Sequence, residues 1–192
     1  GPGSMRTCRS ARSRSTAPPP IFRGEFADRI LERLCRFEIP AERLELEVTE
    51  SVFIGQRAES VERTLTTLSE AGVTIALDDF GTGFASLTHL KQFPVDVLKI
   101  DCSFVSKLTD DQDEGEDAVI VDAILYLAHS LGMMTVAEGI ETLAQRNYLR
   151  RKGCDLGQGY LFSRAVAASS VPVLTRRRFL RDPDHELLRA QA

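Results

Sequence analysis

The chain has 192 residues, of which 43% are hydrophobic and 27% charged, a composition typical of a folded globular domain. Its net charge of −4 argues against a nucleic-acid polymer as partner, and no apolar run is long enough to cross a membrane. Its four cysteines are scattered without a Cys-x-x-Cys pair, which argues against a zinc site and favours a reduced, cytoplasmic protein.

The first twenty residues offer no side chains for a core. Residues 1–4 resemble the remnant of a cleaved tag, and residues 5–20 are rich in arginine, serine and proline. A solvated tail is favoured over a nucleic-acid-binding arm, because the arginines come without aromatic side chains. We therefore expect residues 1–20 to be a tag remnant and disordered leader, 21–182 one domain, and 183–192 a tail.

The first half of that domain predicts helices and strands in alternation. Apolar residues at helical spacing predict a helix over 24–37, and residues 44–49 alternate between apolar and polar, as a strand does. A second helix, marked by Val61, Leu65 and Leu68, stops at Gly72. It is followed by a buried strand over 73–77, which leads into Asp78 and Asp79.

The same alternation continues to the end of the chain. We expect, in order, a helix over 84–90, a strand over 95–100, an acidic loop over 110–117, a helix over 118–131, a strand over 133–137, a helix over 143–151, a strand within 154–161 and a helix from Val171. Strands that alternate with helices predict an α/β fold with about five parallel strands. At this point an open sheet is the simplest arrangement, and no dinucleotide-binding or phosphate-loop motif marks a nucleotide fold.

Carboxylates occur where several of these strands end. Asp78 and Asp79 by themselves fit either a metal site or a turn followed by a helix cap. Their recurrence at other strand ends, with one lysine among them, favours two-metal hydrolysis of a phosphodiester, in which metals lower the pKa of an attacking water. The full set is Glu47, Glu50, Asp78, Asp79, Lys99, Asp101, Glu138, Glu141 and Gln158.

Five segments in this order resemble the successive motifs of EAL domains, which are bacterial cyclic di-GMP phosphodiesterases. The segments are 45–50, 78–83, 98–101, 137–141 and 157–162, and the resemblance covers residues from about 22 to 178. It implies a modified TIM-barrel fold, here an incomplete TIM-like (β/α) barrel of about five parallel strands with surrounding helices. It also implies hydrolysis of cyclic di-GMP to pGpG with Mg²⁺ or Mn²⁺, and inhibition by Ca²⁺.

The resemblance implies a role for each of eight side chains. Glu47, Asp78 and Asp79 would be metal ligands, and Asp78 would bridge two ions. Lys99, Glu138 and Gln158 would be catalytic: Lys99 contacts the attacking water, Glu138 acts at the second metal or its water, and Gln158 supports that end of the site. Glu50 and Glu141 would brace the loop from Phe80 to Ser86, which in the family couples dimerisation to activity.

Two features of the family are absent from these 192 residues. The triplet Glu-Ala-Leu, whose glutamate binds a metal in the family, does not occur. The only asparagine, Asn147, falls in a late helix, whereas the family has a metal-binding asparagine before its counterpart of the helix at 24–37. The chain thus resembles an N-terminally truncated EAL domain whose metal site is incomplete.

Three interpretations follow from these absences. The first is a domain that is catalytically inactive alone and acts by binding a protein or cyclic di-GMP. The second is an active phosphodiesterase whose missing ligands come from another chain, and the third is a fragment without function. Because an incomplete barrel exposes a strand edge, we expect a homodimer or a protein partner to cover it.

Overall fold

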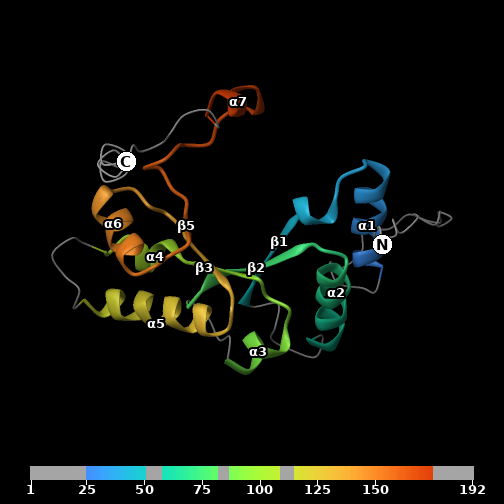
Figure 1. Ribbon diagram of the computed structural model, residues 1–192, viewed down its shortest axis with the longest axis horizontal. Helices are drawn as coiled ribbons and strands as arrows, with labels where there is room; N and C mark the ends of the chain where they lie inside the picture. Colours follow the sequence, from blue (N-terminus) through green and yellow to red (C-terminus); the bar gives the residue numbers. More distant parts are fainter. Residues whose placement is uncertain (1–24, 51–57, 82–86, 109–114, 175–192) are drawn as a thin grey trace, which may run out of the picture.

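The computed structural model describes residues 25–50, 58–81, 87–108 and 115–174 (Figure 1). Five parallel strands form one sheet in which each strand pairs with the next along the chain. This sequential order is that of a (β/α) barrel and differs from a doubly wound sheet, where the order reverses. The strands are β1 (Glu45–Thr49), β2 (Thr74–Phe80), β3 (Val97–Ile100), β4 (Met134–Ala137) and β5 (Leu156–Gly157).

Helices connect the strands, as parallel pairing requires. In Figure 1, α1 and α2 lie beside the β1–β2 end of the sheet, whereas α5 and α6 lie beside its other end. Two short 3₁₀ turns, Ala41–Arg43 and Ala168–Ser170, and the short helix α4 are additions to the predicted elements. The helices are α1 (Phe26–Arg36), α2 (Ala58–Glu70), α3 (Leu87–Gln92), α4 (Cys102–Val105), α5 (Glu116–Ser130), α6 (Leu143–Arg151) and α7 (Val171–Leu174).

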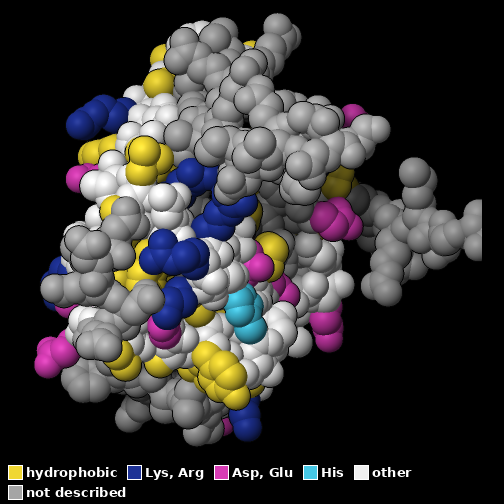
Figure 2. Space-filling view, turned by 60° about the vertical axis from the view of Figure 1, so that its left-hand side comes forward, with side chains coloured by type: hydrophobic (Ala, Val, Ile, Leu, Met, Phe, Trp, Pro, Cys, Tyr) yellow, Lys and Arg dark blue, Asp and Glu magenta, His cyan; other side chains and the backbone are white. Residues whose placement is uncertain are grey.

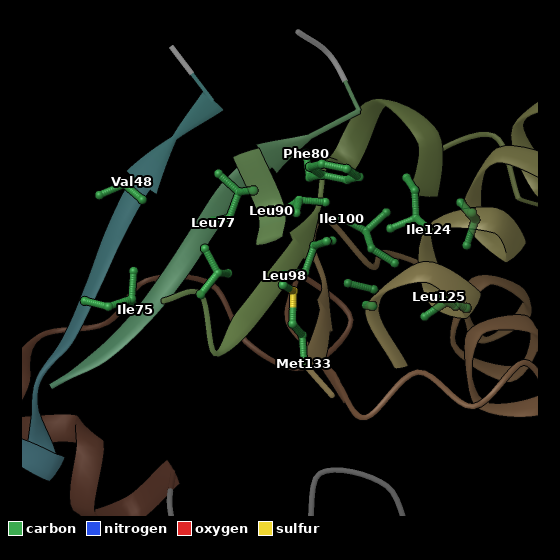
Figure 3. Packing of buried hydrophobic residues seen from close by; sticks show 14 of the residues in the cluster. Val48, Ile75, Leu77, Phe80, Leu90, Leu98, Ile100, Ile124, Leu125 and Met133 are labelled. Atoms are coloured by element: carbon green, nitrogen blue, oxygen red, sulfur yellow. The ribbon is translucent and has the colours of Figure 1, made fainter. Parts of the chain in front are cut away.

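The core lies between the sheet and the helices. Alternate residues of each strand point toward the helices, so Leu77 of β2 and Leu98 of β3 belong to the same cluster of buried side chains as Leu125 of α5 (Figure 3). The residues between them, such as Lys99, take the opposite face of the sheet. This face would be the inside of a closed barrel, and it carries the polar side chains of the strand ends.

One face of the molecule, over α5 and α6, gathers basic side chains (Figure 2). There Lys152 Nζ donates to Asp122 Oδ2 at 2.7 Å, and the hydroxyl of the buried Tyr148 donates to Asp122 Oδ1 at 2.9 Å. Lys152 also lies 5.2 Å from the centre of the Tyr148 ring. Lys152 thus holds α6 against α5.

Several expectations meet the structure only in part. Cys35 is disulfide-bonded, while Cys102 and Cys154 are free, so the expectation of reduced cysteines is wrong for Cys35 and the cytoplasmic location stays a prediction. Among the described residues, no helix combines the length and the apolar character that crossing a membrane requires. The predicted leader 1–20, the start of the helix at 84–90 and the whole predicted tail 183–192 fall outside the described residues.

The burial of Leu98 in the core leads to a prediction about the stability of the domain. Replacing the fully buried Leu98 with alanine should lower the free energy of unfolding by about 2–5 kcal/mol, because it removes apolar contacts and leaves a cavity. Chemical denaturation followed by circular dichroism measures this. The matched change Val119→Ala, at a side chain that is 59% exposed on α5, should alter stability by less than about 0.5 kcal/mol. Equal losses in both variants would contradict this placement of the core.

Candidate functional site

Lys99 of β3 is the centre of the polar side chains on the inner face of the sheet. Its Nζ lies 2.7 Å from Glu47 Oε1 and 2.9 Å from Asp78 Oδ1, and it also contacts Glu138 Oε1. The lysine side chain is only 5% exposed, whereas those of its partners are 19–49% exposed. These four residues, Glu47, Asp78, Lys99 and Glu138, are called the Lys99 cluster below.

The strands bring the Lys99 cluster together from four separate segments. Glu47 lies on β1, Asp78 on β2 and Lys99 on β3, and Glu138 follows directly after β4. Because parallel strands end at the same edge of a sheet, their last inward-facing side chains converge there. A single ammonium then compensates three carboxylates that would otherwise repel one another.

The surroundings of Lys99 stabilise the protonated form of its side chain. Burial alone lowers the pKa of the ammonium, but its contacts with Glu138, Glu47 and Asp78 outweigh burial and raise the pKa above its ordinary value. The stability that the ammonium contributes is therefore fully present below about pH 10, the ordinary value, and is lost as the pH rises through the raised one. At neutral pH the Lys99 cluster keeps its cation.

The end of β2 departs from regular strand geometry. The prediction ended the strand at Leu77, but β2 continues to Phe80, and its pairing with β3 shifts register between Leu77 and Phe80. Asp79 has a φ of +55°, a left-handed conformation that aspartate tolerates better than most residues. In a regular strand Asp78 and Asp79 would point to opposite faces. The register shift and the positive φ of Asp79 together allow both carboxylates to lie at the same site.

Three carboxylates form a group of the size that a metal ion needs. One oxygen from each of Asp78, Asp79 and Glu138 lies within 4.8 Å of the other two. Asp78 Oδ1 is buried, and no directed hydrogen bond satisfies it within the described part of the chain, although Lys99 Nζ is 2.9 Å away. An all-oxygen donor set fits a hard divalent cation.

The structure separates the predicted metal ligands. Asp78 and Asp79 belong to the group of three carboxylates, but Glu47 contacts Lys99 and does not belong to that group. The third member is Glu138, for which we predicted a catalytic role. Gln158 Nε2 donates to Glu138 Oε1 at 2.8 Å, so the amide and the Lys99 ammonium share one carboxylate oxygen.

The two glutamates predicted to brace a loop differ in their surroundings. Glu50 is buried, and its Oε1 accepts a hydrogen bond of 2.8 Å from the N–H of Gly81, directly after β2. Glu141 makes a contact through its backbone, whose N–H donates to Gln145 Oε1 at 2.8 Å. Of the loop from Phe80 to Ser86, the structure describes only the first two residues, so the coupling role stays a prediction.

Asp101 belongs to the site, although the sequence assigned it no role. Burial raises the pKa of Asp79 first, and the nearby carboxylates of Asp78 and Asp101 raise it further. The pKa of Asp101 moves down, because hydrogen bonds from Ser103 outweigh the effect of burial. The backbone N–H of Ser103 donates to Asp101 Oδ1 at 2.9 Å, which makes Asp101 the N-cap of α4. Asp101 follows Lys99 by two residues, and this spacing predicts that the two side chains lie on the same face of the sheet.

Comparison with known proteins identifies a family for most of the chain. The family model described as EAL domain matches residues 16–165. Two relatives come from Pseudomonas aeruginosa: MucR, a bifunctional diguanylate cyclase/cyclic di-GMP phosphodiesterase, is 42% identical over 144 residues, and NbdA, a cyclic di-GMP phosphodiesterase, is 39% identical over 164. These matches cover 75% and 84% of this chain but only 20% and 19% of the relatives, so the chain spans about a fifth of their length.

Solved structures show the same fold. The MucR phosphodiesterase in complex with c-di-GMP is 40% identical, with a TM-score of 0.71 over 77% of this chain and 64% of that one. The manganese and c-di-GMP complex of BlrP1 from Klebsiella pneumoniae is 31% identical, with a TM-score of 0.66 over 74% of this chain and 35% of that one. The likeness to EAL structures confirms the predicted TIM-like arrangement of the five strands.

Removing the cation of the Lys99 cluster should lower the stability of the domain markedly. The change Lys99→Met keeps the length of the side chain but leaves three carboxylates without a counter-charge. We expect a loss of about 3 kcal/mol in the free energy of unfolding at pH 7, which is toward the lower end for a broken buried ion pair because the carboxylates are partly exposed. Urea denaturation measures this change.

Lys107 provides the matched control for that variant. Its Nζ lies 3.0 Å from Asp117 Oδ1, but the lysine side chain is 61% exposed, so Lys107→Met should cost less than about 1 kcal/mol. If Lys99→Met were as harmless as Lys107→Met, the Lys99 ammonium would not be the counter-charge on which the site depends.

Proposed function

The chain belongs to the EAL domain family, and from this premise we propose that it recognises cyclic di-GMP at the Lys99 cluster without hydrolysing it alone. The observation that carries the proposal is the convergence of Glu47, Asp78 and Glu138 on the Lys99 ammonium, beside the third carboxylate of the metal group, Asp79. This is an arrangement suited to phosphate and a divalent cation. MucR and BlrP1 carry cyclic di-GMP in their solved structures, which supports the proposal.

The residues of the site would have different roles in recognition. Asp78, Asp79 and Glu138 would hold Mg²⁺ or Mn²⁺, with Glu47 at the margin of the group, and the ion when bound would supply Lewis acidity toward a phosphate oxygen or a water. The Lys99 ammonium contributes positive charge beside that phosphate. Gln158 fixes the orientation of Glu138, and Glu50 fixes the start of the loop at Gly81.

The proposal of binding without turnover rests on two absent ligands. The 192 residues contain no Glu-Ala-Leu triplet, which in the family supplies a metal-binding glutamate. Their only asparagine, Asn147, lies on α6, where its side-chain oxygen accepts a hydrogen bond from Arg146, away from the strand ends that carry the Lys99 cluster. A two-metal reaction needs both ions to clamp the attacking and leaving oxygens, so losing ligands of one ion removes most of the rate.

An activity assay separates binding from catalysis. We expect the chain, incubated with cyclic di-GMP and Mn²⁺, to yield no pGpG by liquid chromatography, while calorimetry with cyclic di-GMP detects binding. The control is Asp78→Ala, which should give no product either. Formation of pGpG that disappears in Asp78→Ala would contradict the proposal and support the alternative, an active phosphodiesterase with ligands from another chain.

Metal titration tests the group of three carboxylates directly. Calorimetry with Mn²⁺ should give heat that is lost in Asp78→Asn, because this change removes one charged ligand from the group. The control Asp117→Asn changes a carboxylate that pairs with Lys107 on the surface and should bind Mn²⁺ like the parent chain. Equal heats in all three proteins would show that these carboxylates hold no metal.

The inner face of the sheet predicts self-association. Residues paired across parallel strands share a face, so Leu156 and Met134 lie on the inner side, where they are 54% and 48% exposed. We propose that a second copy covers this face, because exposed apolar residues on β4 and on β5, an outer strand of the described sheet, favour association. Light scattering after size-exclusion chromatography should report a dimer, which Leu156→Glu should dissociate. A monomeric parent chain would contradict this.

A further inference from the structure

The helix α5 is apolar on the side that faces away from the core as well as on the side that packs against it. Between Ala118 and Ala128 its only charged residue is Asp122. A helix on the surface of a globular protein normally carries polar side chains on its outer side, whereas a helix that is apolar all round is normally covered all round. The composition of α5 therefore predicts that a further element covers its outer side.

Four residues form the outer face of α5. Val119 is 59% exposed, Ile120 39% and Tyr126 77%, and Ala123 between them is exposed as well. With Ser130, they include the positions 119, 123, 126 and 130, at which steps of four and three residues alternate. This is the spacing of the seam between two packed helices, and a small residue in its middle lets two helix axes approach closely. The outer face of α5 thus has the pattern of a helix that pairs with a second helix.

The surroundings of α5 are acidic at its start and basic toward its end. Residues 110–117 include six acidic residues, and the last two of them, Glu116 and Asp117, form the first turn of the helix. The last turn carries His129, and Lys152 lines one hollow with it, on the face where Figure 2 shows basic side chains gathered. Ends of opposite charge attract each other when two copies of such a helix lie antiparallel.

We propose that the outer face of α5 pairs with the same face of a second copy, antiparallel, about a two-fold axis beside Ala123. In this isologous pair, a residue that precedes Ala123 faces the partner's residue that follows Ala123 by the same number of positions. Ile120 therefore faces the partner's Tyr126, and the acidic Glu116 faces the partner's Ser130 at the basic end. A parallel pair would instead bring the two acidic ends together.

The hollow at the basic end gives this pairing a place for an apolar side chain. It has a volume of about 440 Å³ and in the antiparallel pair faces the partner's Ile120; its lining is Asp122, Leu125, Tyr126, His129, Ser130 and Lys152. Because α5 has 15 residues and is about 22 Å long, the contact is smaller than a standard protein interface. We therefore expect weak pairing that appears at higher concentrations than the inner-face dimer, and it does not depend on cyclic di-GMP.

Sedimentation equilibrium tests the pairing in a chain whose inner face is blocked. Leu156→Glu should be monomeric when dilute and should form a dimer as its concentration rises. Adding Ala123→Glu should abolish this dimer, because two like charges then meet at the axis. Adding Glu116→Lys should weaken it at least about three-fold, because both acidic ends become basic. The matched control Phe37→Glu, at a side chain 64% exposed after α1, should leave it unchanged.

Disulfide cross-linking in the same Leu156→Glu chain tests the antiparallel geometry. In Ala123→Cys the two introduced thiols face each other across the axis, so mild oxidation should link the two copies. In the control Ser130→Cys each thiol lies two turns from the axis, in opposite directions, so the two are about 20 Å apart and too far for a bond. The chain without an introduced thiol, in which Cys102 is exposed and free, gives the background.

The outcomes separate this inference from the other proposals. If Leu156→Glu stays monomeric at every concentration, or Ala123→Cys is linked no more than the background, the pairing is overturned and a different protein covers α5. Equal linking of Ser130→Cys and Ala123→Cys would overturn the antiparallel order. A Leu156→Glu dimer that persists on dilution would contradict the inner-face proposal, and its survival in Ala123→Glu would overturn the α5 pairing too. None of these results bears on the recognition of cyclic di-GMP at the Lys99 cluster.

Discussion

A single ammonium group holds the functional edge of this domain together. Lys99 is buried beneath three carboxylates that come from β1, β2 and the end of β4, and each is too close to the others to carry its charge without compensation. The lysine therefore links the strands electrostatically at the edge where a phosphate would bind. Because its pKa is raised, this link persists across the physiological pH range.

Close backbone approaches complete the geometry that the ammonium begins. A Cβ on Gly139 would fall 2.5 Å from the Cβ of Cys102, and Gly159 meets the backbone of Ile140 in the same manner. These two glycines pack the loops after β4 and β5 against α4 and against each other. Gln158 and Glu138, which are hydrogen-bonded to each other, are thus placed by two loops whose backbones pack closely together.

The inner face of the sheet connects the fold with the question of activity. In a closed barrel this face would be filled by side chains from all strands, but here Met134 and Leu156 are exposed on it. Within the described residues the sheet has five strands, with β1 and β5 as the outer ones. Because the Lys99 cluster spans β1 to β4, the same sheet that exposes these apolar side chains also carries the site.

The sequence by itself determined the order of strands and helices, the parallel sheet and the family, because hydrophobic periodicity and five ordered motifs are local signals. The sequence motifs also identified the polar residues at the ends of the strands. Only the tertiary structure decided which of them meet: Glu138 rather than Glu47 joins Asp78 and Asp79, and Asp101 enters the site. The physical reason is that a left-handed residue at Asp79 and a register shift in β2 redirect side chains that the alternation of a regular strand would separate.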